Sequence, residues 1–380
     1  MHHSSRSEIN RVGEALPTID ALIPAFNVER TIRQSIESLQ RQTVSCQRII
    51  VVNDGSTDAT AEILRDLASR DRRIEIVDQP NKGIVEALNL GLSLCSADYV
   101  ARLDGDDIAF PERIAVQAAY LRANGDVAAV SSQASIIDSD GVLTGELTAP
   151  TPLRSDCDTA PSQEPQLLHP FLMFRRTLGL KVGGYRLVHH AEDIDLYWRL
   201  QQHGRLVDLP EVLGHYRKHP ASVSNKSIVN GRVAAVNSQL SALSARRRRS
   251  GRPDLDFAAA PLPAYVQAAR FDRILDVANT LRLDESERRH LSVSASAKLL
   301  TEAFHRPYEL DVSDCWFVRK RLLDSTPLPP GNRQHLVAIL TSSVRRLLGQ
   351  GLFKEAAALT PFTLYPRIVA QLLRSRLMGR

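Results

Sequence analysis

The 380-residue chain lacks several features that mark common protein classes. Its four cysteines, at positions 46, 95, 157 and 315, form no CxxC pair, so the sequence predicts neither a zinc knuckle nor a disulfide framework. No window approaches 18 uncharged apolar residues, and the opening MHHSSRSEINR lacks the apolar stretch of a signal peptide. We therefore expect a protein of the reducing cytoplasm without a membrane-spanning segment.

A glycine-rich phosphate loop is also missing where two enzyme classes would need one. PAFNVERT (24–31) follows the first predicted strand and contains no glycine, which argues against a dinucleotide-binding oxidoreductase and a sugar-nucleotide pyrophosphorylase. In a dehalogenase-like phosphatase an Asp-x-Asp motif follows the first strand. Here Asp104-Gly105-Asp106 follows the fourth predicted strand, so we set that class aside as well.

The charge is distributed unevenly along the chain. Residues 241–380 hold 23 Lys and Arg against 13 Asp and Glu, whereas residues 1–240 hold 25 against 30. A mildly acidic first part is thus followed by a basic second part, which indicates two parts with different roles.

The first 125 residues alternate two kinds of pattern, which indicates βαβ units. Short apolar runs predict strands, and stretches with apolar residues three and four apart predict helices. The resulting fold class is α/β, a mainly parallel sheet flanked by helices. The strands are predicted at 19–23, 49–52, 74–77 and 99–103, and the helices at 31–42, 59–70, 83–94 and 111–125.

The later chain predicts a different architecture. Residues 150–168 are rich in proline and small polar residues, as in a mobile binding loop. After about residue 226 the patterns are all helical, so we expect a basic all-α C-terminal extension. RRRRSGRP (246–253) is the predicted hinge. The predicted domains are a flexible N-terminus (1–17), an α/β domain (18–225) and a helical region (226–380).

Polar residues follow several predicted strands, at the sheet edge where doubly wound folds bind ligands. They include Asp54, Lys82, and the closely spaced Asp104, Asp106 and Asp107. Each alone could be a turn or a helix cap. Together they predict a binding site, in which Mg²⁺ or Mn²⁺ would offset the repulsion among the three aspartates.

These strand ends carry a resemblance to a known family. PAFN (24–27), VVNDGSTD (51–58), NKG (81–83) and LDGDD (103–107) resemble the nucleotide-sugar site of inverting family 2 glycosyltransferases, which have the GT-A fold. HPFLMFRR (169–176), VGGYR (182–186), AEDIDLYWRL (191–200) and LPEVLGHYRKHPASVS (209–224) resemble the family's acceptor half. The resemblance covers residues 18–225, with the nucleotide-sugar half ending near 125.

The resemblance implies a role for each matching residue. Asp54 would bind the nucleobase, usually uracil, beside the turn from Pro24 to Asn27, and Lys82 would bind the donor. Asp104 would contact the ribose and the metal, Asp106 would be the direct metal ligand, and Asp193 the catalytic base. His219 is either a further metal ligand or a surface histidine. His169 and Arg175 either line the acceptor cleft or have structural roles.

The implied activity is transfer of a sugar from a nucleotide diphosphate sugar to a glycan or lipid-linked acceptor in cell-surface polysaccharide synthesis. The alternative is a catalytically inactive nucleotide-sugar-binding protein on the same fold. The basic, apolar C-terminal segment (352–380) either contacts anionic lipid at the inner face of the membrane or is an ordinary helical subdomain. No motif supports nucleic-acid binding.

Overall fold

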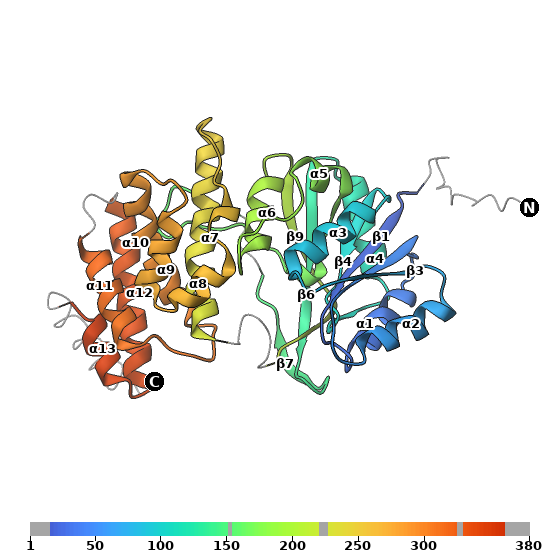
Figure 1. Cartoon of the computed structure of the whole chain (residues 1–380), viewed down its shortest axis with the longest axis horizontal. Coiled ribbons are helices and arrows are strands. Elements are labelled where there is room, and N and C mark those ends of the chain that lie inside the picture. Colours follow the sequence, from blue (N-terminus) through green and yellow to red (C-terminus); the bar gives the residue numbers. More distant parts are fainter. Residues whose placement is uncertain (1–15, 151–153, 220–226, 325–329, 362–380) are drawn as a thin grey trace, which may run out of the picture. The chain divides into compact units, whose positions relative to one another are not determined.

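The computed structural model describes residues 16–150, 154–219, 227–324 and 330–361, and Figure 1 labels its elements. The chain forms two compact units. Unit 1 consists of Met1–Leu153, Pro165–Arg186 and Leu196–Lys218, and unit 2 of Arg154–Glu164, Leu187–Asp195 and His219–Arg380. A single boundary near residue 225 therefore does not describe the division, because two short segments of the predicted α/β domain belong to unit 2.

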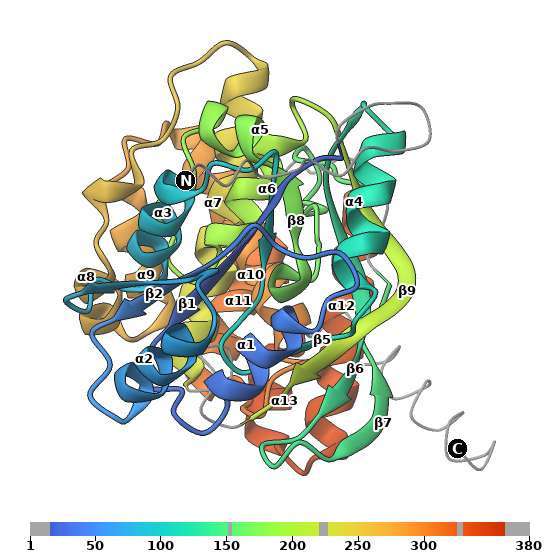
Figure 2. The same ribbon diagram turned by 90° about the vertical axis from the view of Figure 1, so that its right-hand side faces the viewer.

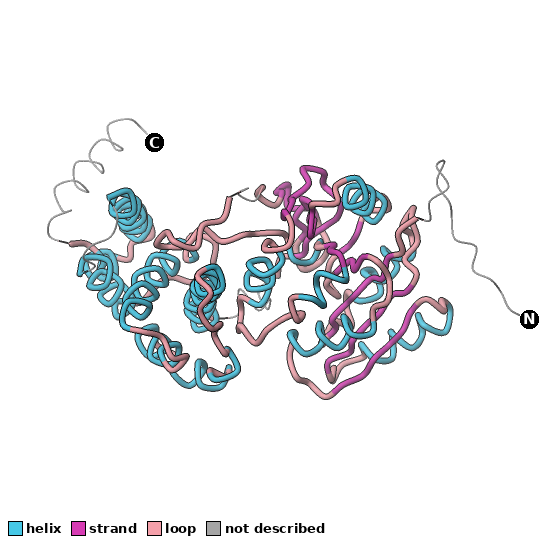
Figure 3. The backbone as a smooth tube through the Cα atoms, turned by 90° about the horizontal axis from the view of Figure 1, so that it is seen from above, coloured by secondary structure: helices cyan, strands magenta, loops and turns pink. Residues whose placement is uncertain are grey.

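Unit 1 contains the strands of the described residues (Figure 3), joined in one mixed sheet. The order is β3-β2-β1-β4-β8-β6-β9-β5, with β7 paired to β6. The neighbours β3, β2, β1 and β4 are parallel as predicted, whereas β8 runs antiparallel to both β4 and β6. The strands are β1 (Ile19–Ala25), β2 (Arg48–Asp54), β3 (Ile74–Gln79), β4 (Tyr99–Arg102), β5 (Ile108–Ala109), β6 (Val127–Ile137), β7 (Leu143–Leu147), β8 (Met173–Arg175) and β9 (Arg205–Arg217).

Helices cover both faces of the parallel strands, because β1 presents alternate residues to opposite sides. Ile19, Ala21 and Ile23 share a core with α1, α2 and α4. The other face receives α3, whose Gly91 lies so close to the sheet that a Cβ would come 2.1 Å from Leu22 Cδ1. In Figure 2, α3 lies on one side of β1 and β2, and α1 and α2 lie on the other side. The helices are α1 (Ile32–Gln40), α2 (Thr60–Arg70), α3 (Ile84–Leu94), α4 (Arg113–Ala123) and α5 (Arg176–Lys181).

Unit 2 is helical in its described residues, as the sequence predicts, and packs around its own apolar core. In the described part of the chain no helix has the length and apolar character needed to cross a membrane. Helix α6 (Glu192–Leu200) begins in unit 2 and ends in unit 1. The others are α7 (Ile228–Arg249), α8 (Leu262–Ala268), α9 (Phe271–Asn279), α10 (Glu285–Glu302), α11 (Val312–Asp324), α12 (Pro330–Gly349) and α13 (Phe353–Leu359).

The proline-rich segment predicted as a mobile loop is fastened to unit 2 over residues 154–164. The buried Glu164 accepts hydrogen bonds from Gln239 Nε2 of α7 (2.6 Å) and from Lys298 Nζ of α10 (2.7 Å). The Gln239 side-chain oxygen in turn accepts the backbone N–H of Ser162 at 2.8 Å. The prediction of a mobile loop was wrong for residues 154–164. The local sequence does not reveal that Glu164 has partners 75 and 134 positions away.

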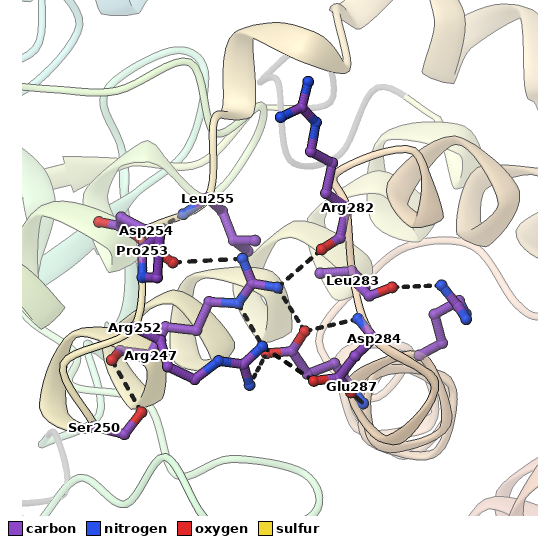
Figure 4. Close-up of polar contacts among 11 residues, drawn as sticks. Arg247, Ser250, Arg252, Pro253, Asp254, Leu255, Arg282, Leu283, Asp284 and Glu287 are labelled. Atoms are coloured by element: carbon purple, nitrogen blue, oxygen red, sulfur yellow. Dashed lines mark hydrogen bonds and ion pairs between the residues drawn. The ribbon is translucent and has the colours of Figure 1, made fainter.

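The predicted hinge at 246–253 is also wrong, because its arginines form ion pairs within unit 2 (Figure 4). Arg247 is buried and donates to both oxygens of Glu287, at 2.8 and 2.6 Å. Arg252 approaches the same carboxylate at 2.9 Å. Glu287 and Asp284 also form the capping box that begins α10. Arginines of the run 246–253 thus fasten the end of α7 to the start of α10.

Most of the predicted flexible N-terminus, 1–15, and the segment 362–380 lie outside the described residues.

Candidate functional site

The aspartates that follow β4 form a compact group of carboxylates. One oxygen from each of Asp104, Asp106 and Asp107 lies within 4.8 Å of the others. Asp107 is fully buried, and its Oδ2 has no hydrogen-bond partner among the described residues. Burial and the nearby Asp106 and Asp104 raise its pKa well above the usual range. An oxygen buried without a partner beside two further carboxylates fits a site for a hard divalent cation.

Two arginines lie among these aspartates, which the sequence analysis did not anticipate. The buried Arg102 donates from Nη2 to Asp104 Oδ1 at 2.6 Å. Arg217, at the end of β9, donates its backbone N–H to Asp107 Oδ1 (2.7 Å) and its Nε to the carbonyl of Asp106 (2.8 Å). The protein itself therefore offsets part of the repulsion that we expected a cation to offset.

Arg217 also connects the aspartate loop to two other parts of unit 1. Its Nη1 donates to the carbonyls of Asp138 (3.1 Å) and Ser139 (3.2 Å) in the turn between β6 and β7. Its Nη2 donates to the Gln34 side chain on α1 at 3.1 Å. The Arg217 side chain thus joins the loop 103–107 to the turn between β6 and β7 and to α1.

Asp54, at the end of β2, builds the turn that contains Lys82. The carboxylate is buried and accepts three hydrogen bonds, from Gln79 Nε2 (2.6 Å) and from the backbone N–H groups of Lys82 and Gly83 (2.9 Å each). Gly55 has φ +70°, and a Cβ there would lie 2.6 Å from Asn81 N, so glycine permits the close approach. The predicted residues Asp54 and Lys82 are thus brought together, with the Lys82 side chain exposed.

The turn after β1 is fastened to the turn after β2. Asn27 has a left-handed backbone (φ 52°), and its side-chain oxygen accepts the N–H of Thr57 at 2.8 Å. Its own N–H donates to Ser56 Oγ at 3.0 Å. Pro24 lies in β1, in register with Val52. Phe26 between them is 47% exposed, an apolar ring at a polar strand edge that the sequence analysis did not single out.

Asp193 and His219 belong to unit 2, whereas the other predicted donor and metal residues belong to unit 1. Asp193 lies in the first turn of α6, where its Oδ1 accepts the N–H of Ile194 at 2.8 Å. This contact agrees with a helix-terminal role and is compatible with a catalytic one. His219 is half-buried just after β9.

For His169 and Arg175 the contacts support the structural alternative. Arg175 donates to the backbone carbonyls of Val127 (2.8 Å), Leu121 (2.6 Å) and Asn124 (3.0 Å), which fixes the end of α4. The ring of His169 lies 3.0 Å from Tyr185 Oη. Burial and the charge of Arg102 lower the pKa of His169 well below its usual value, so the ring is neutral.

Comparison with known proteins supports the resemblance drawn from the motifs. The family model described as glycosyl transferase family 2 matches residues 20–179. The putative glycosyltransferase EpsE of Bacillus subtilis (strain 168) is 30% identical over 271 residues, 68% of this chain and 92% of the relative. The amylovoran biosynthesis glycosyltransferase AmsE of Erwinia amylovora is 32% identical over 199 residues, 50% of this chain and 73% of the relative.

Similarity to a solved structure is evidence for the fold. The mannosyltransferase PcManGT from Pyrobaculum calidifontis, in complex with GDP-Man and Mn²⁺, has a TM-score of 0.50 and 17% sequence identity. The match covers 90% of this chain and 85% of that one. At this identity it shows a shared architecture, the mixed sheet with flanking helices described above. The chain therefore belongs to glycosyltransferase family 2 and has the GT-A fold.

Proposed function

We propose that this chain is an inverting glycosyltransferase that uses a nucleotide diphosphate sugar, with UDP as the preferred nucleotide, in polysaccharide synthesis. The observation that carries the proposal is the group of carboxylates at 104–107, in which Asp107 keeps a buried oxygen that has no partner among the described residues. The relative named for amylovoran biosynthesis and the neighbour bound to GDP-Man and Mn²⁺ support the substrate class.

In this proposal the strand ends of unit 1 bind the donor. Asp54 binds the nucleobase, and the exposed ring of Phe26 offers a stacking surface for it. Pro24 and Asn27 shape the adjacent turn, and Lys82 extends toward the donor. Asp104 and Asp106 hold Mg²⁺ or Mn²⁺, with His219 as a candidate additional ligand. When bound, the cation supplies charge stabilisation for the departing diphosphate.

Asp193 acts in the proposal as the general base. Its carboxylate takes the proton of the acceptor hydroxyl as that oxygen attacks the anomeric carbon. The bond from this carbon to the diphosphate oxygen breaks at the same time, and the nucleoside diphosphate leaves. One displacement inverts the anomeric centre, so no second carboxylate is needed as a covalent nucleophile.

Two variants test the proposal against a panel of UDP-glucose, UDP-N-acetylglucosamine and GDP-mannose with Mn²⁺. We expect the wild type to gain thermal stability with one of them, since a ligand that binds only the folded state raises the melting temperature. Asp106→Asn should lose the metal-dependent part of this gain. Asp193→Asn should keep it while nucleoside diphosphate release falls at least about 100-fold.

The same panel of donors also distinguishes an active enzyme from the alternative, an inactive binding protein. Such a protein would gain stability with a donor but release no nucleoside diphosphate with any acceptor supplied. Stabilisation that EDTA leaves unchanged would contradict the metal site, and full turnover by Asp193→Asn would remove that residue from its role.

We further propose a cytoplasmic location with peripheral contact to anionic membranes through the C-terminal region. Trp316 on α11 is 52% exposed with Lys320 Nζ 5.6 Å from its ring centre, and Phe353 on α13 is 67% exposed. Exposed aromatic rings beside cations are typical of surfaces that insert into lipid headgroups. The basic segment 362–380 lies outside the described residues. Flotation with phosphatidylserine vesicles tests this, and a protein that stays at the bottom at low salt would contradict it.

A further inference from the structure

The segment that carries Asp193 is packed into the core of unit 2. Leu187–Asp195 belongs to this unit, and its Val188 and Ala191 are fully buried. Both lie in the same apolar core as Val233 and Val236 of α7, and Ile194 packs against that core. The start of α6 is therefore packed in the core of the helical C-terminal unit, although the matched family model ends at residue 179.

The turn before α6 has a conformation that its surroundings must maintain. The N–H of Ala191 donates to the carbonyl of Val188 at 3.0 Å, and between them His190 has φ 62°. The left-handed region costs a residue other than glycine about 1 kcal/mol, so such a turn persists only where neighbouring groups hold it. Helix α6 begins directly afterwards, with Asp195 N–H donating to Ala191 at 3.0 Å. The turn therefore determines the direction in which Asp193 is presented.

Asn237 of α7 holds this turn by one hydrogen bond. Its Nδ2 donates to the carbonyl of His189 at 2.9 Å, and its side chain is buried. The Asn237 Oδ1 has no partner in the described part of the chain. A buried amide oxygen left unpaired costs about 1–3 kcal/mol, which an apolar side chain would avoid. The hydrogen bond that Asn237 Nδ2 donates to His189 therefore best explains an asparagine at this position.

The His189 side chain is held by a second helix. Its ring packs edge to face against the buried Tyr265 of α8, with 6.2 Å between the ring centres. The backbone carbonyl of His189 is therefore held by α7, and its ring is held by α8. Two helices of unit 2 thus fix a turn that ends two residues before Asp193.

We propose that Asn237 is a positioning residue for the transfer reaction. By fixing the His189 carbonyl it orients the turn 188–191 and, through that turn, the carboxylate of Asp193. The inference rests on the proposed function, in which Asp193 is the base. It gives the helical C-terminal unit a part in catalysis that is separate from contact with membranes.

Full-length variants test this inference by separating turnover from donor binding. Asn237→Leu keeps the approximate size of the side chain but cannot donate, and Asn237→Asp places an acceptor opposite the carbonyl. We expect each to lower kcat for nucleoside diphosphate release at least about 10-fold, with water as acceptor and the donor selected from the panel above. The KM for that donor and its Mn²⁺-dependent thermal stabilisation should stay within about twofold.

The control is Ser238→Ala on the same helix. Ser238 is also buried, but its hydroxyl bonds the carbonyl of Ala235 within α7 at 3.4 Å. This variant should keep the wild-type kcat. All assays are run well below each variant's melting temperature, so that loss of folded protein does not enter kcat.

Any other result of these assays contradicts either the positioning role of Asn237 or the role of Asp193 as the base. A kcat within twofold of wild type for Asn237→Leu contradicts the positioning role, as does a parallel loss of donor binding and stability, which indicates only a structural residue. Asp193→Asn is measured alongside. If that variant is active, the proposed base is wrong; if it is inactive while Asn237→Leu is active, only the positioning inference fails.

Discussion

At the scale of single residues, the loop 103–107 shows how a protein keeps three carboxylates close together. Arg102 lies against Asp104 and Arg217 against the other two aspartates, yet Asp107 Oδ2 keeps no partner in the described residues. The Arg102 side chain and the backbone N–H of Arg217 reduce the repulsion, but they do not satisfy every buried oxygen. The loop is thus held in shape while remaining attractive to a cation.

Arg217 contacts the loop 103–107 through its backbone and its side chain, and Arg217→Met tests the side-chain part. The change removes donors to the carbonyls of Asp106, Asp138 and Ser139. Because these carbonyls lie at partly buried or exposed residues and lose their donors, we expect the free energy of unfolding to fall by about 1–3 kcal/mol. Affinity for Mn²⁺ should fall as well, since the aspartate loop loses its fixed shape. Urea unfolding and Mn²⁺ titration measure the two effects.

The neighbouring lysine provides a matched control. Lys218 pairs with Glu146 at 3.3 Å, but both side chains are more than half exposed. Lys218→Met should change the free energy of unfolding by less than about 0.5 kcal/mol. Equal effects of the two substitutions would show that the contacts of Arg217 with the loop are not important.

At the scale of elements, the sequence predicts those parts whose order is set by local patterns. The four parallel strands β1–β4 and the helices between them lie where the apolar periodicity placed them, within a few residues. Strand β6 was missed, because VAAVSSQASII is almost entirely buried and its serines break any alternation of apolar and polar residues.

The errors have a common physical origin. The fixed segment 154–164, the arginine run at 246–253 and the role of Arg217 all depend on partners distant in sequence, such as Asp107 for Arg217. Composition alone suggests loops and hinges at such positions. The site residues that the motifs imply are, by contrast, close to strand ends, and Asp54 and Lys82 do meet at one turn.

The segment 154–164 yields a prediction about its buried ion pair. Lys298 of α10 lies 2.7 Å from Glu164 and 2.9 Å from Glu302, with 14% of its side chain exposed. Lys298→Met leaves Glu164 without its cation. Removing one partner of a buried pair is strongly destabilising, so the free energy of unfolding should fall by about 3 kcal/mol. Guanidinium unfolding gives the value.

The control for Lys298→Met is an exposed ion pair on the same helix, α10. Arg289 pairs with Glu285 on the same helix, but both side chains are at least 70% exposed. Arg289→Met should cost less than about 0.5 kcal/mol. A loss of that size for Lys298→Met would mean that the segment 154–164 is not held by this pair.

At the scale of the whole molecule, two partly buried histidines make the free energy of unfolding depend on pH. Burial, with the nearby charge of Arg246, lowers the pKa of His290 from 6.5 to about 4, and burial, with His189 and Arg306, lowers that of His190 to about 4. A histidine whose pKa is lowered by folding stabilises the folded state above the unfolded pKa near 6.5. That contribution is lost as pH falls from 6.5 toward 4.

We therefore expect the free energy of unfolding to fall between pH 7 and pH 5, by at most about 2 kcal/mol for each of these histidines. His290→Gln removes one titrating group and should flatten this dependence. His305→Gln, at an exposed position, is the control. Melting temperatures recorded across this pH range provide the test, and an unchanged slope for His290→Gln would contradict the prediction.

The interleaving of the two units along the chain has a consequence for how the protein is made. Unit 1 is complete only when residue 218 has left the ribosome, although synthesis of unit 2 has by then begun twice, at residues 154 and 187. Synthesis of unit 1 is therefore finished only after two segments of unit 2 have been made, unlike domains that are completed one after another during translation. Fragments produced by cutting the gene at one point should for this reason be poor substitutes for the intact polypeptide.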